Sequence, residues 1–522
     1  MVFIIKRANL IKLNVIFVFS ANFIIMIRIT LAIFLSITLL TAGSEPTTAQ
    51  QKYASVQKDI SKLTDNKAIS QAAVSICAIR GNGDKIVDIN AETMLVPASN
   101  MKLISTGAAM HKFGPEYRYE TTLSHDGEIV DGVLKGNVYV IGGADPTLGS
   151  IDSIATPIEN TFAQWTEILK KAGISHIEGR VIGDGRYFDR MIEEPSWLVE
   201  DVGTYYGAGT TGLMFYENMQ SFRVSAGQAV GDSVNICPSY PDTPWMTFRY
   251  SCTTGKEGTG DQLFMFTSEL SPIAEIRGTF GVDRKAKRLD CSNKFPEYTC
   301  AYHFNEYLKG HGITCSGGAG DFRLYPEWET YGELKTLGKT LSPQMRRIIF
   351  ETNHISNNVY AETLLRTLGR ETTGSACYDS SYVAIGKVLS ELNVDTSRGC
   401  RIKDGSGLSR QNYISSDFLC RFLHGMMDSP HFEAFVETLP SPGSKGTLAY
   451  NMKKYPEDLR MRIKVKSGSM NGVRCYSGYI IPTDGCREDV IIFSLMVNNC
   501  TSPSWEIRNL LDSIMGTLAE LN

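Results

Sequence analysis

The chain has 522 residues, which is more than one hydrophobic core usually supports, so two or three domains are expected. Hydrophobic residues make up 43% of the sequence and charged residues 21%, as in soluble globular proteins. The net charge of −4 provides no basic surface for nucleic acid, so a nucleic-acid partner is not expected.

The first 49 residues are predicted to be a signal-peptide region. Basic residues at 6–12 precede an apolar stretch, and 26–28 restarts the same pattern just before the apolar run 30–40. A basic segment followed by an apolar run and then small residues is the layout of a secretory signal. The repeated pattern also suggests that translation starts at Met26.

Cleavage near Gly43 or Ala49 is expected, because Arg28 interrupts the apolar residues and leaves only a short run after it. An uncleaved membrane anchor is the alternative, since about 20 apolar residues can span a bilayer. We therefore expect an exported, periplasmic protein, free or loosely associated with the membrane. No stable membrane span is expected after cleavage, and the sequence does not predict the oligomeric state.

Twelve cysteines also favour an oxidising compartment over the cytosol. None stands in a C-x-x-C pair, which argues against a zinc ribbon or a thioredoxin-like motif. Buried free thiols are one interpretation of these residues, and local disulfides are the other. The sterically reasonable local disulfides are Cys237–Cys252, Cys291–Cys300 and Cys475–Cys486.

The first part of the mature chain predicts strands and one apolar helix. Residues 72–90 read as a strand pair around a Gly-Asn-Gly-Asp turn, and a helix is expected over 99–111. From 118 to 330 the sequence is rich in Gly, Thr and short alternating runs, of which 133–141 is an example. This region is predicted to be mostly β, with an occasional helix such as 162–172.

Helices return after residue 341, over 341–356 and 358–369. The alternation of Met, Ile and Val with Arg and Lys over 461–466 predicts a half-buried strand. Two more strands are expected over 475–481 and 490–497. The last helix should begin after Ser504 as its N-cap, and its apolar stripe is core packing. That stripe is Ile507, Leu510, Leu511, Ile514, Leu518 and Leu521.

Three short motifs carry the candidate chemistry. They are Ser-Asn-Met-Lys at 99–102, Ser-Asn-Asn at 356–358 and Lys-Ser-Gly at 466–468. Each is weak alone, because 55–58 is another Ser-x-x-Lys and 469–471 another Ser-x-Asn. Context favours the three motifs named first. The serine of the motif at 99–102 opens an apolar helix, so this serine and its lysine lie one turn apart on one face, near free backbone N–H groups.

A serine hydroxyl becomes a useful nucleophile only when a nearby base takes its proton. The eight histidines stand in no Gly-x-Ser-x-Gly or trypsin-like setting, so Lys102 is the candidate base for Ser99. The lysine must then be neutral, which burial and the neighbouring positive charge of Lys466 would both favour. Such general-base help contributes about 10²–10⁴-fold to the rate. This chemistry requires neither a metal nor a cofactor.

The other motif residues suit the remaining steps of acyl transfer. Ser356 can relay a proton to the leaving amine, and Asn358 can hydrogen-bond the lysine and the substrate amide. Lys466 and the Ser467 hydroxyl suit recognition of a terminal carboxylate. Gly468 permits close backbone approach to a ligand.

An oxyanion hole is expected from the backbone N–H groups of Ser99 and Ser469. One such donor contributes about 10²–10³-fold to the rate.

This motif set resembles that of penicillin-binding proteins and class A β-lactamases, in which it takes the forms S-x-x-K, S-D-N and K-T-G. The chain is most similar to the class C low-molecular-mass penicillin-binding proteins, from about residue 52 to the C-terminus. These are D-alanyl-D-alanine carboxypeptidases with endopeptidase activity. The stretches that resemble the family are 142–148, 195–218, 356–369, 404–415 and 466–480. Here Ser467 replaces the commoner threonine and keeps its hydroxyl.

The resemblance implies an α/β fold with a transpeptidase/β-lactamase-like domain, an antiparallel sheet flanked by helices. The first two motifs lie 257 positions apart, and the resemblance implies that this gap holds a β-rich insertion of two smaller domains, as in that family. The predicted catalytic domain is 50–117 with 331–522. The predicted inserted domain is 118–220 with 300–330, and a second domain, 221–299, is nested in it.

The resemblance also implies substrates and further site residues. Peptidoglycan peptides and β-lactams are the expected partners. Similar proteins recognise the side chain of a diamino acid in the stem peptide, and Arg410 and Asp184 match by motif position. Surface or turn roles are the alternatives for these two residues. Asp404 is expected to hold its glycine-rich loop.

Two other functions compete with the carboxypeptidase. A β-lactamase shares the acylation machinery, but class A enzymes need closer motifs and an extra glutamate, and class C enzymes carry a tyrosine in the second motif. A catalytically silent wall-binding scaffold would have no need of Ser99 together with Lys102. The expected activity is therefore a serine D-Ala-D-Ala carboxypeptidase and endopeptidase.

Overall fold

The computed structural model describes residues 48–269, 271–324 and 333–522. The chain divides into two compact units, Met1–Lys58 and Asp59–Asn522. The predicted signal-peptide region lies outside the described residues except for its last two positions. Helix α2 (Thr48–Thr64) comes first, and Ser55 and Lys58 of the competing Ser-x-x-Lys are exposed on it. Among the described helices none has the length and hydropathy needed to cross a bilayer.

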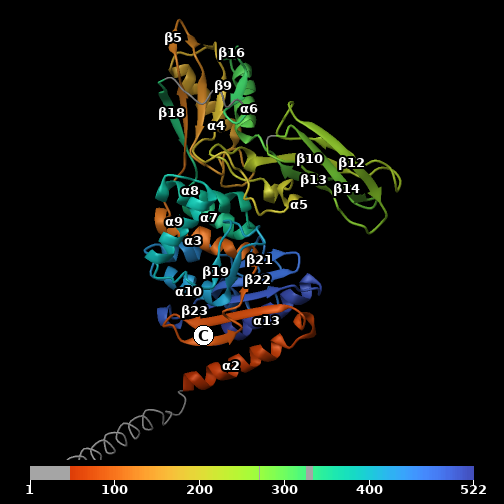
Figure 1. Ribbon diagram of the computed structural model, residues 1–522, viewed down its shortest axis with the longest axis vertical. Coiled ribbons are helices and arrows are strands. Elements are labelled where there is room, and N and C mark those ends of the chain that lie inside the picture. The colour runs from red at the N-terminus through yellow and green to blue at the C-terminus, as the bar shows by residue number, and fades with distance from the viewer. Residues whose placement is uncertain (1–47, 270, 325–332) are drawn as a thin grey trace, which may run out of the picture. The chain divides into compact units, whose positions relative to one another are not determined.

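The two ends of the chain form one antiparallel sheet, as predicted. Its spatial order is β2-β1-β23-β22-β21, and every neighbouring pair is antiparallel. Strands β21, β22 and β23 lie next to each other in Figure 1. The bounds are β1 (Ala73–Arg80), β2 (Lys85–Ile89), β21 (Ile463–Met470), β22 (Val473–Ile480) and β23 (Ile491–Asn498). The sheet therefore joins residues separated by about four hundred positions.

Helix α3 (Met101–Phe113) is the central element of the core beside this sheet. Its first ten residues are buried, including Lys102, and it contacts α7, α8 and α9. Helix α3 also contacts α10 (Ser416–Met426) and α11 (Phe432–Glu437). The bounds of the other helices in this part of the chain are α7 (Met345–Ile355), α8 (Asn358–Thr373), α9 (Tyr378–Glu391), α12 (Glu457–Arg462) and α13 (Ser504–Ala519), of which α12 contacts β21 and α13 contacts β22. A small sheet of β3 (Met94–Leu95), β20 (Tyr413–Ser415) and β19 (Cys400–Arg401) lies near them.

The predicted apolar stripe of α13 is buried, but Pro503 is the N-cap and Ser504 the first helical residue. The strand predicted over 461–466 is partly wrong. Met461 and Arg462 are the last two residues of α12, Met461 is 52% exposed, and β21 begins at Ile463. Alternation also placed Lys466 on the polar face, yet it is fully buried, because the Ser99 turn and Ser356 cover that end of the strand.

The middle of the chain is an insertion with sheets of its own. One sheet has the order β17-β9-β7-β4-β18 and a second β16-β8-β6-β5. The strand predicted over 133–141 is two strands, one in each sheet, separated at 136–137. The bounds are β4 (Glu120–His125), β5 (Glu128–Val130), β6 (Val133–Lys135), β7 (Val138–Gly142), α4 (Ile158–Lys171), β8 (His176–Ile177), β9 (Val181–Asp184), α5 (Val199–Val202), α6 (Pro296–Gly310), β16 (Thr314–Cys315), β17 (Ala319–Asp321) and β18 (Lys335–Leu341).

Within the insertion, six consecutive strands form two three-stranded sheets, β11-β10-β15 and β12-β14-β13, around a separate apolar cluster. The bounds are β10 (Met219–Ser225), β11 (Asn235–Pro238), β12 (Thr247–Gly255), β13 (Phe264–Phe266), β14 (Ile273–Gly281) and β15 (Lys287–Ser292). The domain boundaries given above stay predictions. All twelve cysteines lie within the described residues and are free thiols, so none of the local disulfides is present.

Candidate active site

The first motif lies where a 3-10 turn, Ala98–Asn100, leads into α3. This turn leaves Ser99 partly exposed, whereas Lys102, one helical turn later, is completely buried. Lys102 Nζ lies 3.1 Å from Ser99 Oγ, 2.6 Å from Asn358 Oδ1 and 2.7 Å from the carbonyl oxygen of Ser406. The spacing of serine and lysine therefore places both groups within hydrogen-bond distance, as predicted.

These contacts match a neutral lysine that accepts the serine proton. A neutral amine has two N–H donors and one lone pair. The amide oxygen of Asn358 and the carbonyl of Ser406 can only accept, so they occupy the two donors. The lone pair then remains for the Ser99 hydroxyl. Burial lowers the pKa of Lys102 to about 7, against the opposing charges of Asp404 and Glu362.

The insertion fixes the orientation of the Asn358 amide. Asn358 Nδ2 donates to the carbonyl of Tyr206, at 2.9 Å, in the 3-10 turn Tyr205–Gly207. The amide nitrogen is therefore occupied, and the oxygen is the atom that faces Lys102. A flipped amide would present N–H groups to the lysine and lose both contacts.

The second and third motifs meet through Lys466. Its Nζ donates to Ser356 Oγ at 3.0 Å and to the carbonyl of Ser467 at 2.8 Å. Burial, and then the charge of Lys102, hold the pKa of Lys466 well below its usual value. Ser467 Oγ donates to Thr447 Oγ1 at 3.0 Å. Of the two causes expected to lower the pKa of Lys102, burial therefore acts on it, whereas the charge of Lys466 does not; the charge of Lys102 instead lowers the pKa of Lys466.

Two glycines allow other segments to approach the turn that carries Ser99. A Cβ on Gly468 would meet the carbonyl oxygen of Pro97 at 2.6 Å and Asn100 at 3.0 Å. Gly407 has a φ of +83°, and a Cβ added there would clash with the carbonyl oxygen of Ala98. Gly468 therefore allows the turn that carries Ser99 to lie against β21, and its close approach to a ligand stays a prediction.

Gly468→Ala is therefore expected to displace the Ser99 turn. We expect a loss of about 1–3 kcal/mol in the free energy of unfolding, as for other overpacked positions, together with slower acylation of Ser99. Chemical denaturation and labelling with a fluorescent penicillin measure the two effects. Gly386→Ala is the matched control. Gly386 lies in α9, and a Cβ added there would meet nothing within 4 Å. Equal behaviour of the two variants would contradict the packing role.

Two buried carboxyl groups hold the loop that supplies the Ser406 carbonyl. Asp404 accepts from the N–H groups of Gly407, at 2.7 Å, and Ser409, at 2.6 Å, so its predicted loop-holding role is confirmed. Glu362 accepts from the N–H groups of Gly405 and Ser406, and burial raises its pKa to about 8. Since Glu362 is one turn after Asn358 on α8, both side chains face the lysine site.

Arg410 follows this loop, and its guanidinium lies 3.5 Å from the carbonyl of Asn471, just after the third motif. The acidic group near it is Asp201, not Asp184. Burial raises the pKa of Asp201, while its hydrogen bond with Tyr206 and the charge of Arg410 lower it. Sequence reasoning missed Asp201, which carries no motif signal.

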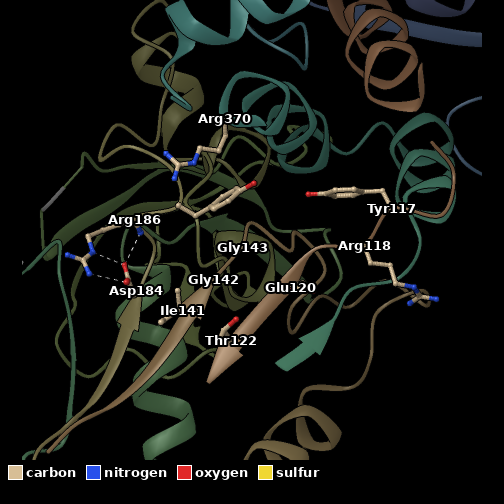
Figure 2. Close-up of a pocket in the computed structure, with 11 residues that line it drawn as sticks. Tyr117, Arg118, Glu120, Thr122, Ile141, Gly142, Gly143, Asp184, Arg186 and Arg370 are labelled. Atoms are coloured by element: carbon tan, nitrogen blue, oxygen red, sulfur yellow. Dashed lines mark hydrogen bonds and ion pairs between the residues drawn. The ribbon is translucent and has the colours of Figure 1, made fainter. Parts of the chain in front are cut away.

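Asp184 is in a different pocket. It ends β9 and is bound by Arg186, with Nε and Nη2 at 3.0 and 3.1 Å from its two oxygens. Figure 2 shows this pair on one side of a pocket of about 760 Å³ that Arg370 also lines. Arg370 lies twelve residues after Asn358 on α8, or about 18 Å along the helix axis. The structure therefore does not bring Asp184 together with the other predicted site residues.

Comparisons with known proteins identify the family of the chain and its fold. The model of the D-Ala-D-Ala carboxypeptidase 3 (S13) family matches residues 56–520. A D-alanyl-D-alanine carboxypeptidase of Actinomadura sp. is 25% identical over 497 residues, covering 90% of this chain and 86% of the relative. D-alanyl-D-alanine carboxypeptidase DacB of Haemophilus influenzae is 22% identical over 428 residues, covering 81% and 84%.

Among solved structures, the crystal structure of penicillin binding protein 4 (dacB) from Haemophilus influenzae matches with a TM-score of 0.75. The match covers 89% of this chain and 99% of that chain at 20% identity, so it shows a common fold. The predicted transpeptidase-like fold with its insertion is thereby confirmed. With the family model spanning nearly all of the described residues, the chain belongs to the D-Ala-D-Ala carboxypeptidase 3 (S13) family.

Proposed function

We propose that Ser99 is the nucleophile of this serine D-Ala-D-Ala carboxypeptidase. The observation that supports this assignment most strongly is the environment of Lys102, whose two N–H groups face pure acceptors while Ser99 Oγ lies 3.1 Å away. The substrate is the D-Ala-D-Ala end of a peptidoglycan stem peptide, or the equivalent cross-link, and β-lactams acylate the same serine.

In the first step Lys102 Nζ takes the proton of Ser99 as Oγ attacks the carbonyl carbon of the penultimate D-alanine. The backbone N–H groups of Ser99 and Ser469 stabilise the oxyanion. The peptide C–N bond then breaks, and the proton passes through Ser356 Oγ to the leaving amine. Terminal D-alanine or a cross-linked amine departs. Water hydrolyses the resulting ester and restores the Ser99 hydroxyl.

Lys466 and Ser467 bind the terminal carboxylate of the substrate. Lys466 is buried and its pKa is lowered, so an arriving carboxylate stabilises its charged form and couples binding to protonation. Asp201 and Arg410 supply one negative and one positive group, which suit the ammonium and carboxylate of a diamino acid side chain. Export to the periplasm would bring the enzyme to this substrate.

Asp201→Asn is expected to raise KM for a stem peptide with a free side-chain ammonium by about ten-fold, because an ion pair is lost. Acylation by a penicillin that lacks such a side chain should remain within about two-fold of wild type. Steady-state kinetics with the two substrates separates these effects. Asp184→Asn is the matched control and should leave both values unchanged. A larger KM effect at Asp184 would reverse the assignment.

Labelling with a fluorescent penicillin, followed by mass spectrometry of the labelled peptide, tests the proposed function. A stable adduct on Ser99 is the expected result. Rapid loss of penicillin without a lasting adduct would indicate a β-lactamase. Intact penicillin with folded protein would indicate a catalytically silent wall-binding protein. An adduct on another residue would contradict the assignment of Ser99.

A further inference from the structure

A strained turn of the insertion presents a buried carboxyl group to the second motif. Tyr216, Glu217 and Asn218 have φ values of 53°, 54° and 53°, so three successive non-glycine residues are left-handed. Such conformations are uncommon and persist only where the surroundings hold them. The Asn218 side chain does so, since it accepts from Phe215 N–H at 3.2 Å and donates to the carbonyl of Gly209 at 3.0 Å.

The turn directs Glu217 toward the first turn of α8. The side chain is 8% exposed, and its carboxyl oxygens accept from Ser150 Oγ and from Asn357 Nδ2, both at 2.7 Å. Tyr360 of α8 donates to Ser150 Oγ at 3.1 Å, so Glu217 is connected to α8 by two routes. No step of acyl transfer uses this carboxyl group.

Asn357 is the middle residue of the second motif and uses both ends of its amide. Its Oδ1 accepts from Tyr360 N–H at 3.1 Å and caps α8, and its Nδ2 is the donor to Glu217. The residues on either side carry the chemistry, since Ser356 contacts Lys466 and Asn358 contacts Lys102. Ser356 has a φ of 62°, which is an uncommon conformation for a residue other than glycine. Because Ser356 and Asn358 are bonded to Asn357 on either side, a rotation of Asn357 would move both of them.

We propose that Glu217 is a positioning residue for the second motif and that it requires an amide, not a carboxylate, at position 357. This inference rests on the proposed function and adds to it a residue that acts through Ser356 and Asn358. It also explains why this chain carries Ser-Asn-Asn where the related motif is commonly S-D-N. An aspartate would still cap α8, but it would place a second carboxylate against Glu217.

The charges around Glu217 make a second carboxylate unfavourable. Burial and the charges of Asp152 and Asp290 raise the pKa of Glu217 to about 7. The hydrogen bonds that Glu217 accepts from Ser150 and Asn357 act in the opposite direction. Arg288 is paired with Asp290 at 2.8 Å; burial lowers the pKa of Arg288, and the charges of Asp290 and then Glu217 raise it. A further negative charge at position 357 would therefore have to be protonated or displaced, and displacement moves Ser356 and Asn358.

The test is a pair of substitutions that exchange donor and acceptor. Asn357→Asp alone is expected to lower the rate of Ser99 acylation by a fluorescent penicillin at least about ten-fold. Glu217→Gln alone should cost about two- to three-fold, because a glutamine side chain can accept from Asn357 and donate to Ser150. Combining them should restore the rate to within about three-fold of wild type, since the amide nitrogen introduced at position 217 can donate to the carboxylate introduced at position 357.

Rescue distinguishes positioning from general loss of stability, and thermal unfolding of every variant is recorded beside the rates. Glu128→Gln, at an exposed glutamate of β5, is the matched control and should not rescue Asn357→Asp. The inference is overturned if Asn357→Asp acylates like wild type, or if Glu217→Gln fails to rescue it. If the wild-type protein forms no Ser99 adduct, the proposed function fails instead. The unfolding temperatures of the two single variants and of their combination still show whether residues 217 and 357 are coupled.

Discussion

Ser99→Ala is expected to abolish both peptide turnover and the penicillin adduct while the protein remains folded. The substitution removes the attacking oxygen, and loss of a serine nucleophile lowers turnover by about 10⁴-fold or more. Lys102 keeps its contacts with Asn358 and Ser406, and Ser99 is partly exposed, so unfolding should change by about 1 kcal/mol or less. Labelling, turnover and thermal unfolding measure the three quantities.

The competing Ser-x-x-Lys supplies a matched control for this variant. Ser55 is exposed on α2, so Ser55→Ala should leave turnover, labelling and unfolding unchanged. Loss of folding in Ser99→Ala would assign Ser99 a structural role. Retained turnover would mean that another residue is the nucleophile.

Removal of the base is expected to have the second largest effect. Lys102→Ala should slow acylation by about 10²–10⁴-fold, the usual contribution of a general base. Lys102→Arg should be equally poor at every pH, because a guanidinium keeps its proton. Lys58→Ala, at the exposed lysine of the competing motif, is the control. Unchanged acylation in Lys102→Ala would exclude the lysine as base.

The pH dependence of the wild-type rate tests the same assignment. The reactive form of Lys102 is neutral, and burial lowers its pKa to about 7. Lowering the pH through 7 protonates the amine, so acylation should fall about ten-fold per pH unit below that value. Raising the pH above 7 should bring the rate to a plateau. A rate that increases as the pH falls through 7 would show that the charged lysine is the active form.

The composition of the site was predictable where it depends on local spacing. Ser99 and Lys102 are one helical turn apart, and this spacing alone places their side chains on one face of α3. Strands β22 and β23 were also predictable, because a local pattern of apolar residues identifies them. Glu362 could also have been found, because it is four residues after Asn358 on the same helix.

Other predictions failed or stayed open because periodicity does not specify what covers a surface. The pattern of β21 placed Lys466 beside Lys464 on a polar face, but Ser356 and the Ser99 turn bury it. Asp184 was chosen by motif position, and the fold directs it to Arg186 in another pocket.

The sequence by itself therefore predicted the pair of Ser99 and Lys102, the order of the three motifs and the presence of a long insertion, because each depends on residue type and spacing. Tertiary structure decided how the insertion serves the site. The Tyr206 carbonyl orients the Asn358 amide, and Glu217 holds Asn357, across about 150 positions of sequence. Contacts between such distant segments form only when the chain closes on itself, and no local pattern of residues records which groups will then meet.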